Sequence, residues 1–249
     1  MQERTQKLWL AADWPLQETV LAGVSLSTHP HKPHGFNLAL HVDEAADAVH
    51  ERRAQLLAAL PGEAQPMWLS QVHGDEIVED GQYQPGVQAD AAISRSAAWM
   101  AVVMTADCLP VLLATAQGET VAAIHAGWPG LHQGIIGKTV ARMGVLPQTL
   151  YAWIGPGISA AHYEVDEVFY QRFLSMNQSY ACFFRANRPG HFLADLPAMA
   201  EAQLQAAGVP AEHIHASGLC SYADARFFSH RRDRGRAGRM VSFIVKRSS

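Results

Sequence analysis

Three residues that can bind a transition metal, His73, Cys108 and His125, each lie at the end of a short apolar run of the sequence. Two imidazoles and one thiolate are ligands that suit zinc or copper. A structural zinc site is normally closed by four protein ligands, whereas a catalytic site with three keeps one position for water or substrate. The set therefore predicts a metal site that does chemistry rather than one that only supports the fold.

Two polar residues beside these ligands could take part in that chemistry. Asp107 directly precedes Cys108, where its carboxylate could orient a ligand histidine, act as a general base, or simply form a turn before Pro110. Gln71 lies two residues before His73, so in a strand both side chains point to the same face. Gln71 could therefore bind substrate or only satisfy the end of the strand.

The same residues allow two other kinds of catalyst. In a cysteine hydrolase, Cys108 would be the nucleophile and His125 its base, acting on an amide such as one in a cell-wall precursor. In a copper polyphenol oxidase, Met104 or Met240 would add a weak fourth ligand. A coupled copper cluster needs more histidines, and the two His-x-His pairs, at 29–31 and 213–215, do not clearly supply them.

Other side chains that could bind anions or metals, or react as thiols, lie elsewhere in the sequence. Arg231 and Arg232 follow a pair of phenylalanines, and guanidinium groups held in this way can bind phosphate or carboxylate. Cys182 is expected to be an inert buried thiol, and Cys220 has no assigned role. The segment His29–His34 is expected to be a solvated loop.

Apolar runs and turn residues predict the strands that must hold these residues. Counting along a hairpin with Gln117 and Gly118 at its turn, Pro110 opposes His125. Cys108 then shares a face with His125 as a diagonal neighbour, roughly 7 to 8 Å away, and His73 comes from a third strand. Strands are expected over 67–72, 100–106, 111–115, 121–124, 150–154 and 239–245.

Helical periodicity predicts the remaining elements. Asp43 is expected to cap a helix with apolar residues between 46 and 60, and Asp195 to cap a helix over 196–207. Further helices are expected over 131–143, which ends at Gly144, and over 165–174. Strands and helices in alternation predict an α/β or α+β fold.

Composition limits the class of protein. The 249 residues, 49% of them hydrophobic, are enough for one large domain, and no linker or repeat divides the chain. A net charge of -4 offers no general basic surface for nucleic acid or anionic lipid. The apolar stretch 99–116 contains Asp107 and Pro110, so two buried strands are expected rather than a membrane helix. Three unpaired cysteines and the absence of a secretory signal predict a cytoplasmic protein.

Several motifs together resemble the YfiH-type laccase-domain family, whose members are described as multicopper polyphenol oxidoreductases and as purine nucleoside phosphorylases. They occur in family order along nearly the whole chain, and their combination is highly specific although no single motif is. The matching stretches are residues 23–25, 37–38, 68–74, 89–91, 104–112, 125–128, 155–156, 163–165 and 227–233.

The resemblance implies a single α/β domain over residues 1–249, with mixed sheets between helical layers, similar to cysteine-dependent deamidating toxins. It implies that His73, Cys108 and His125 bind a metal, usually zinc and alternatively copper. It also implies phosphorolysis of adenosine, inosine and methylthioadenosine, and deamination of adenosine. A nucleoside and phosphate would be the partners of this enzyme, as a monomer or a homodimer.

The resemblance also suggests which residues surround the metal. Asn37, Arg231 and Arg232 map near the family's pocket, where Asn37 would contact substrate and an arginine would hold an anion. Asp107 or Glu164 would move protons. The chain departs from the family pattern at Pro129 and at Gln88, where the family has arginines. Both departures remove a cation that could have bound phosphate.

Overall fold

Two β-sheets packed face to face form the centre of the molecule. The computed structural model describes residues 7–27 and 35–247, so the predicted loop His29–His34 lies outside the described residues. The first sheet has the strand order β1-β2-β14-β6-β3, formed by Trp9–Ala11, Val20–Ser25, Met240–Lys246, Trp99–Thr105 and Gln65–Met67. The second has the order β13-β9-β7-β8-β5-β4, formed by Ile214–Ala216, Leu150–Ile154, Leu109–Thr115, Val121–Ala126, Ala91–Ser94 and Ile77–Glu79.

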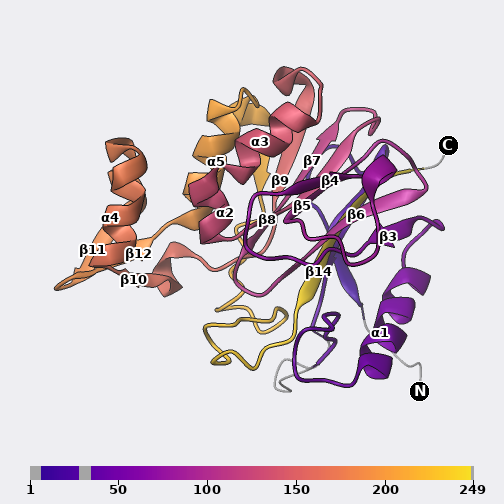
Figure 1. Cartoon of the computed structure of the whole chain (residues 1–249), viewed down its shortest axis with the longest axis horizontal. Helices are drawn as coiled ribbons and strands as arrows, with labels where there is room; N and C mark the ends of the chain where they lie inside the picture. Colours follow the sequence, from indigo (N-terminus) through magenta and orange to yellow (C-terminus); the bar gives the residue numbers. More distant parts are fainter. Residues whose placement is uncertain (1–6, 28–34, 248–249) are drawn as a thin grey trace.

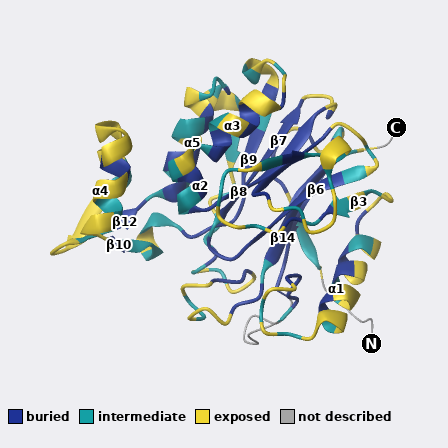
Figure 2. Ribbon diagram, viewed as in Figure 1, coloured by how far each residue is buried: buried dark blue, intermediate teal, exposed yellow. Residues whose placement is uncertain are grey.

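Both sheets are covered on both faces, so the residues of their central strands are mostly apolar. Alternate residues of a strand point to opposite faces, and in β7 Leu112 packs between the two sheets while Leu113 packs against helices. In β6, Val103 packs between the sheets and Val102 packs on the outer side. The result is a single mixed α/β domain with a buried centre (Figure 2) and helices outside, as predicted.

Helices cover the outer faces of the sheets (Figure 1). Leu56 of α1 packs on the first sheet, whereas Ile136 of α3 and Met199 of α5 pack on the second. A small lobe projects from one side and contains α4 with a three-stranded sheet of order β10-β12-β11. The helices are α1 Ala46–Ala58, α2 Trp128–Gln133, α3 Ile135–Arg142, α4 Glu167–Met176 and α5 Leu196–Ala206, and the lobe strands are Glu164–Asp166, Phe184–Arg188 and His191–Ala194.

The structure confirms one helix cap and corrects three helix predictions. Asp195 caps α5 by accepting a hydrogen bond from the Ala198 amide. Asp43 caps nothing, because α1 begins after Ala45 with no side-chain cap. The expected helix over 131–143 is two helices, since Gly134 adopts a left-handed conformation with φ of 80° and ends α2. The helix expected from 165 begins at Glu167 instead, with Asp166 as its cap.

The strand predictions hold except in one segment. The apolar stretch 99–116 forms β6 and β7 joined by a bend, and no helix among the described residues is long and apolar enough to cross a membrane. The strand expected over 67–72 ends at Met67. Beyond it, the Gln71 side chain takes the place of a strand partner, because its amide bonds both the N–H and the C=O of Met104 at 2.7 and 2.8 Å.

Candidate metal centre and substrate pocket

His73, Cys108 and His125 converge at the edge of the second sheet where β7 begins and β8 ends. Their ligand atoms all lie within 4.8 Å of one another. The hairpin register is as predicted, because Pro110 of β7 pairs with His125 of β8. Cys108 lies at the bend before β7, so it reaches the same edge. His73 comes from a loop after β3 rather than from a strand, and its backbone has a positive φ of 59°.

Asp90 positions two of the three candidate ligands. Its carboxylate is fully buried and lies 2.7 Å from Nδ1 of His125. It also accepts backbone hydrogen bonds from Val72, His73 and Gly74 at 3.2, 3.0 and 2.7 Å. These bonds hold the strained turn at His73, and they leave Nε2 of His125 free to face Cys108. A carboxylate that orients a ligand histidine in this way also fixes its tautomer.

The role of orienting a ligand histidine had been suggested for Asp107, and the structure assigns it to Asp90. Asp107 instead accepts a hydrogen bond from the Ser221 hydroxyl at 2.6 Å and another from the Arg231 amide at 2.7 Å. It also has a positive φ of 83°, so it forms the sharp bend before Cys108. The signal for Asp90 was present in the sequence as a single acid between alanines at the start of an apolar strand.

Cys108 and His125 favour an ion pair. Burial raises the pKa of the Cys108 thiol, but the neighbouring His125 and His73 outweigh burial and lower it to about 6. Burial lowers the pKa of His125, but Cys108 and Asp90 outweigh burial and raise it to about 9. At neutral pH the protein without metal therefore presents a thiolate beside an imidazolium, and the thiolate is the form of cysteine that binds metal.

The donors and the space around them suit a metal ion. A soft thiolate with two imidazoles is a donor set used for zinc and copper. Gly127 borders the cluster, and a Cβ at this position would lie 3.0 Å from Sγ of Cys108 and 3.2 Å from Cδ2 of His73. Its φ of -68° is ordinary for any residue, so the absence of a side chain here keeps space open rather than permitting an unusual backbone. The cluster could therefore bind a metal.

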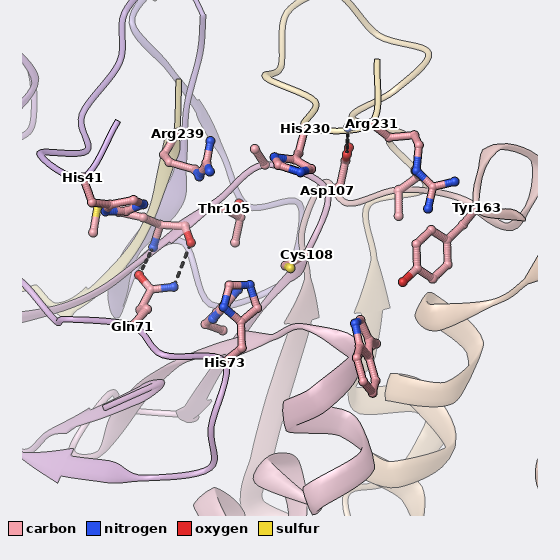
Figure 3. Close-up of a pocket in the computed structure, with 15 residues that line it drawn as sticks. His41, Gln71, His73, Thr105, Asp107, Cys108, Tyr163, His230, Arg231 and Arg239 are labelled. Atoms are coloured by element: carbon pink, nitrogen blue, oxygen red, sulfur yellow. Dashed lines mark hydrogen bonds between the residues drawn. The ribbon is translucent and has the colours of Figure 1, made fainter. Parts of the chain in front are cut away.

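A cavity of about 440 Å³ opens above the cluster. In Figure 3, His41 and Arg239 lie on one side of Cys108, while Tyr163 and Arg231 lie on the other. The hydroxyl of Thr105, which is 1% exposed, has no hydrogen-bond partner among the described residues. The lining residues are His41, Gln71, His73, Met104, Thr105, Ala106, Asp107, Cys108, His125, Trp128, Ile158, Tyr163, His230, Arg231 and Arg239.

Among the remaining predicted site residues, Gln71 and Arg231 line this cavity. The amide of Gln71 is engaged by Met104, which favours the structural interpretation over substrate binding. The guanidinium of Arg231 lies 5.1 Å from the ring centroid of Tyr163 and donates to the Glu164 carbonyl at 3.1 Å. Arg231 is thus held at the cavity wall, as an anion-binding residue requires.

Three predicted residues, Asn37, Arg232 and Glu164, lie outside the cavity lining. Asn37 is fully buried, and its Oδ1 accepts from the amides of Ala39 and Arg239 at 3.0 and 2.9 Å, so it shapes the backbone that carries Arg239. Arg232 donates to the carbonyls of Ser221, Tyr222 and Phe227, and so it ties the C-terminal loop together. The side chains of Asn37 and Arg232 were both expected near substrate. Both are instead hydrogen-bonded to backbone groups of the protein.

Glu164 is also placed away from the cavity. Its carboxylate pairs with Arg188 at 2.7 Å, and the hydrogen bonds from Arg188 hold its pKa at about 2. A carboxylate so acidic and so placed is unsuited to moving protons near neutral pH. Cys182 is exposed, so the expectation that it is buried was wrong.

Sequence reasoning missed several cavity residues, of which Arg239 matters most. Burial lowers its pKa, and the nearby Cys108 and Asp107 partly offset that effect. Arg239 is one of six arginines between residues 226 and 239, a group that could bind phosphate or carboxylate, and it directly precedes the last strand. Trp128, Tyr163 and His230 lie in stretches that resemble the family, but their positions at the cavity, like that of His41, depend on contacts between distant segments.

Known proteins share this architecture. The family model described as multi-copper polyphenol oxidoreductase laccase matches residues 18–247. A Xylella fastidiosa protein named purine nucleoside phosphorylase is 38% identical over 249 residues, covering 94% of this chain and 95% of its own. The Escherichia coli relative, named purine nucleoside phosphorylase YfiH, is 35% identical over 244 residues, covering 94% and 97%.

Solved structures agree with the sequence matches. A Neisseria meningitidis crystal structure superposes with a TM-score of 0.89 at 33% identity, covering 97% of this chain and 100% of its own. The crystal structure of YlmD from Geobacillus stearothermophilus gives 0.88 at 30% identity, covering 100% and 98%. The chain therefore belongs to the YfiH-type family of multicopper polyphenol oxidoreductase laccase-domain proteins.

Proposed function

We propose that this chain is a cytoplasmic, zinc-dependent purine nucleoside phosphorylase acting on adenosine, inosine and methylthioadenosine, with adenosine deaminase activity. The observation that carries the proposal is the His73, Cys108 and His125 cluster at the base of a cavity lined by arginine and aromatic side chains. The names of several relatives, purine nucleoside phosphorylase, support the same reaction class.

Zinc held by His73, Cys108 and His125 would supply a Lewis acid that polarises a substrate oxygen or lowers the pKa of a water molecule. Different residues around this cluster would bind the phosphate and the nucleoside. Arg239 and Arg231 face the cavity and can bind phosphate through charge-assisted hydrogen bonds. Pro129 and Gln88, where the family pattern has arginines, are not among the residues that line the cavity.

Aromatic and hydroxyl groups would bind the nucleoside. Trp128, Tyr163 and Ile158 provide apolar surface for a purine ring at the cavity wall. Burial raises the pKa of Tyr163, and the negative charges nearby add to the effect, so its phenol stays protonated and can donate a hydrogen bond.

Asp107 is the carboxylate of the cavity lining that could accept or return a proton. Its two oxygens accept hydrogen bonds from Ser221 and Arg231, which fix the orientation of the group. Each oxygen of a carboxylate has two acceptor positions, so Asp107 would keep acceptor capacity beyond these two hydrogen bonds. Deamination of adenosine needs proton transfer to the leaving amine, and in this proposal Asp107 would supply that proton.

A second candidate function is a cysteine amidohydrolase acting on a cell-wall precursor. The observation that favours it is the Cys108 thiolate beside the His125 imidazolium, an arrangement that also activates nucleophilic cysteines. Activity that survives complete chelation but is lost on alkylation of Cys108 would support the hydrolase. The copper polyphenol oxidase alternative rests on the family description and on Met104 in the cavity lining, and it predicts oxygen uptake with phenols after copper loading.

The proposed function is tested by incubating the zinc-loaded protein with adenosine, inosine or methylthioadenosine, with and without phosphate. We expect the free base from each nucleoside only when phosphate is present, and inosine from adenosine regardless of phosphate. His125→Ala is the control, because it removes a metal ligand. The absence of any product above that of the control would refute the proposal.

A further inference from the structure

A second nucleophilic cluster lies outside the metal centre and is formed by Cys220, Ser159 and His162. The Ser159 hydroxyl donates to Sγ of Cys220 at 3.1 Å, and the Ser159 amide donates to the same sulfur at 3.4 Å. Nδ1 of His162 lies 3.7 Å from this sulfur and 3.3 Å from the Ser159 hydroxyl. Three side chains from two distant segments thus meet at one sulfur atom.

The cluster is rigid and partly accessible. The ring of His162 stacks on Tyr222, with centroids 4.6 Å apart and an interplanar angle of 22°, so the imidazole is held beside the thiol. The backbone of Cys220 pairs with Gly157 as a β-bridge. Cys220, Ser159 and His162 are each partly exposed. A nucleophile within reach of a base that a third group orients is the usual arrangement for an activated side chain.

The surroundings favour the ionised form of this thiol. Burial raises the pKa of Cys220, but the hydrogen bonds from Ser159 and from the amides of Tyr222 and Ala223 outweigh it, so the pKa is lowered. The thiolate is the form that attacks sulfur. Cys182 offers a natural comparison within the same chain, because it is more exposed and no hydrogen bond to its sulfur is found among the described residues.

We propose that Cys220 is a thiol-exchange site at which low-molecular-weight disulfides form a mixed disulfide with the protein. The thiol proton passes to His162 or to water, and the thiolate attacks one sulfur of the disulfide. A new S–S bond forms to Cys220, the original S–S bond breaks, and the other half of the reagent leaves as a thiolate that takes up a proton. The reaction needs only the disulfide as oxidant, and it is independent of the metal centre.

Cys220 is connected to Asp107, at the cavity wall, through two neighbouring residues. Cys220 is followed by Ser221, whose hydroxyl donates to Asp107. Gly157, the bridge partner of Cys220, is followed by Ile158, which lines the cavity and whose amide donates to the Asp107 carbonyl at 2.8 Å. A group attached to Cys220 would therefore lie next to Ser221 and close to Ile158, the two residues whose hydrogen bonds hold Asp107 in place.

The test is the rate at which each cysteine of the full-length protein reacts with oxidised glutathione at pH 7, followed by acid quenching and peptide mass spectrometry. A pH profile of alkylation by iodoacetamide gives the apparent pKa of each thiol. We expect Cys220 to have a lower apparent pKa than Cys182. Because nucleophilicity falls only partly as the pKa falls, we expect about a threefold rate advantage for each pH unit of difference.

Two variants test whether Ser159 and His162 activate the Cys220 thiol, as opposed to its exposure alone setting the reaction rate. Ser159→Ala removes the strongest hydrogen bond to the sulfur, and His162→Phe removes the base while keeping a ring to stack on Tyr222. Both are expected to slow Cys220 at least threefold and to leave Cys182 unchanged. The proposal is overturned if Cys220 reacts no faster than Cys182, if its apparent pKa is no lower, or if both variants react as the parent does.

Discussion

Replacement of Asp90 by asparagine should weaken the metal centre without touching a ligand. In the parent protein, Oδ1 of Asp90 serves His125 and the His73 amide, while Oδ2 serves the amides of Val72 and Gly74. Asparagine keeps one acceptor oxygen and turns an NH2 group toward the other donors. Leaving two N–H groups unpaired beside this buried side chain costs about 1–3 kcal/mol each, so the free energy of unfolding should fall by about 3 kcal/mol.

The same substitution should lower zinc affinity by about 10–100-fold, the usual effect of losing a group that orients a ligand histidine. Competition with a chromogenic chelator measures this affinity, and chemical denaturation measures stability. Asp195→Asn is the matched control, because Asp195 caps α5 far from the cluster and asparagine caps helices equally well. Zinc affinity equal to that of the parent protein in Asp90→Asn would refute the assigned role of Asp90.

Three further predictions concern the cluster and the cavity. In the metal-free protein, thiolate absorbance that is lost in Cys108→Ser should titrate with a midpoint near pH 6, and His125→Asn should move that midpoint upward by removing the positive partner; an unchanged midpoint would contradict the ion pair. Gly127→Ala should weaken zinc binding while leaving the circular dichroism spectrum unchanged, because its Cβ would enter the space beside the sulfur; full zinc affinity would show that this space is not used. Arg239→Ala should raise the KM for phosphate by about 10-fold or more, the value of one charge-assisted hydrogen bond, whereas the surface variant Arg188→Ala should leave it unchanged; equal effects would remove Arg239 from the phosphate site.

The part of the site that could be predicted depends on local structure. The turn at Gln117 and Gly118 sets the hairpin register, and that register alone brings Cys108 and His125 to one edge. Apolar runs identify the central strands because both faces of both sheets are buried. The hairpin register and the apolar runs are each determined by a few neighbouring residues, so the sequence predicts them.

The part that could not be predicted depends on contacts between distant segments. His73 was expected in a strand, but the buried carboxylate of Asp90 holds it in a strained turn. Asn37 was expected to meet substrate, but its partner is the backbone of Arg239, 202 residues away. Whether a polar side chain faces a ligand or its own chain is decided by such pairings, which spacing along the sequence does not reveal.

A zinc titration of the metal-free protein tests whether a metal at His73, Cys108 and His125 supports phosphorolysis. Metal-free protein is mixed with inosine and phosphate, zinc is added in steps, and the rate of hypoxanthine release is measured. The rate should rise with added zinc and level off at about one equivalent per chain, as expected for a single three-ligand catalytic site. Hypoxanthine release that is unaffected by zinc, or none at any zinc level, would show that a metal at this cluster does not support phosphorolysis.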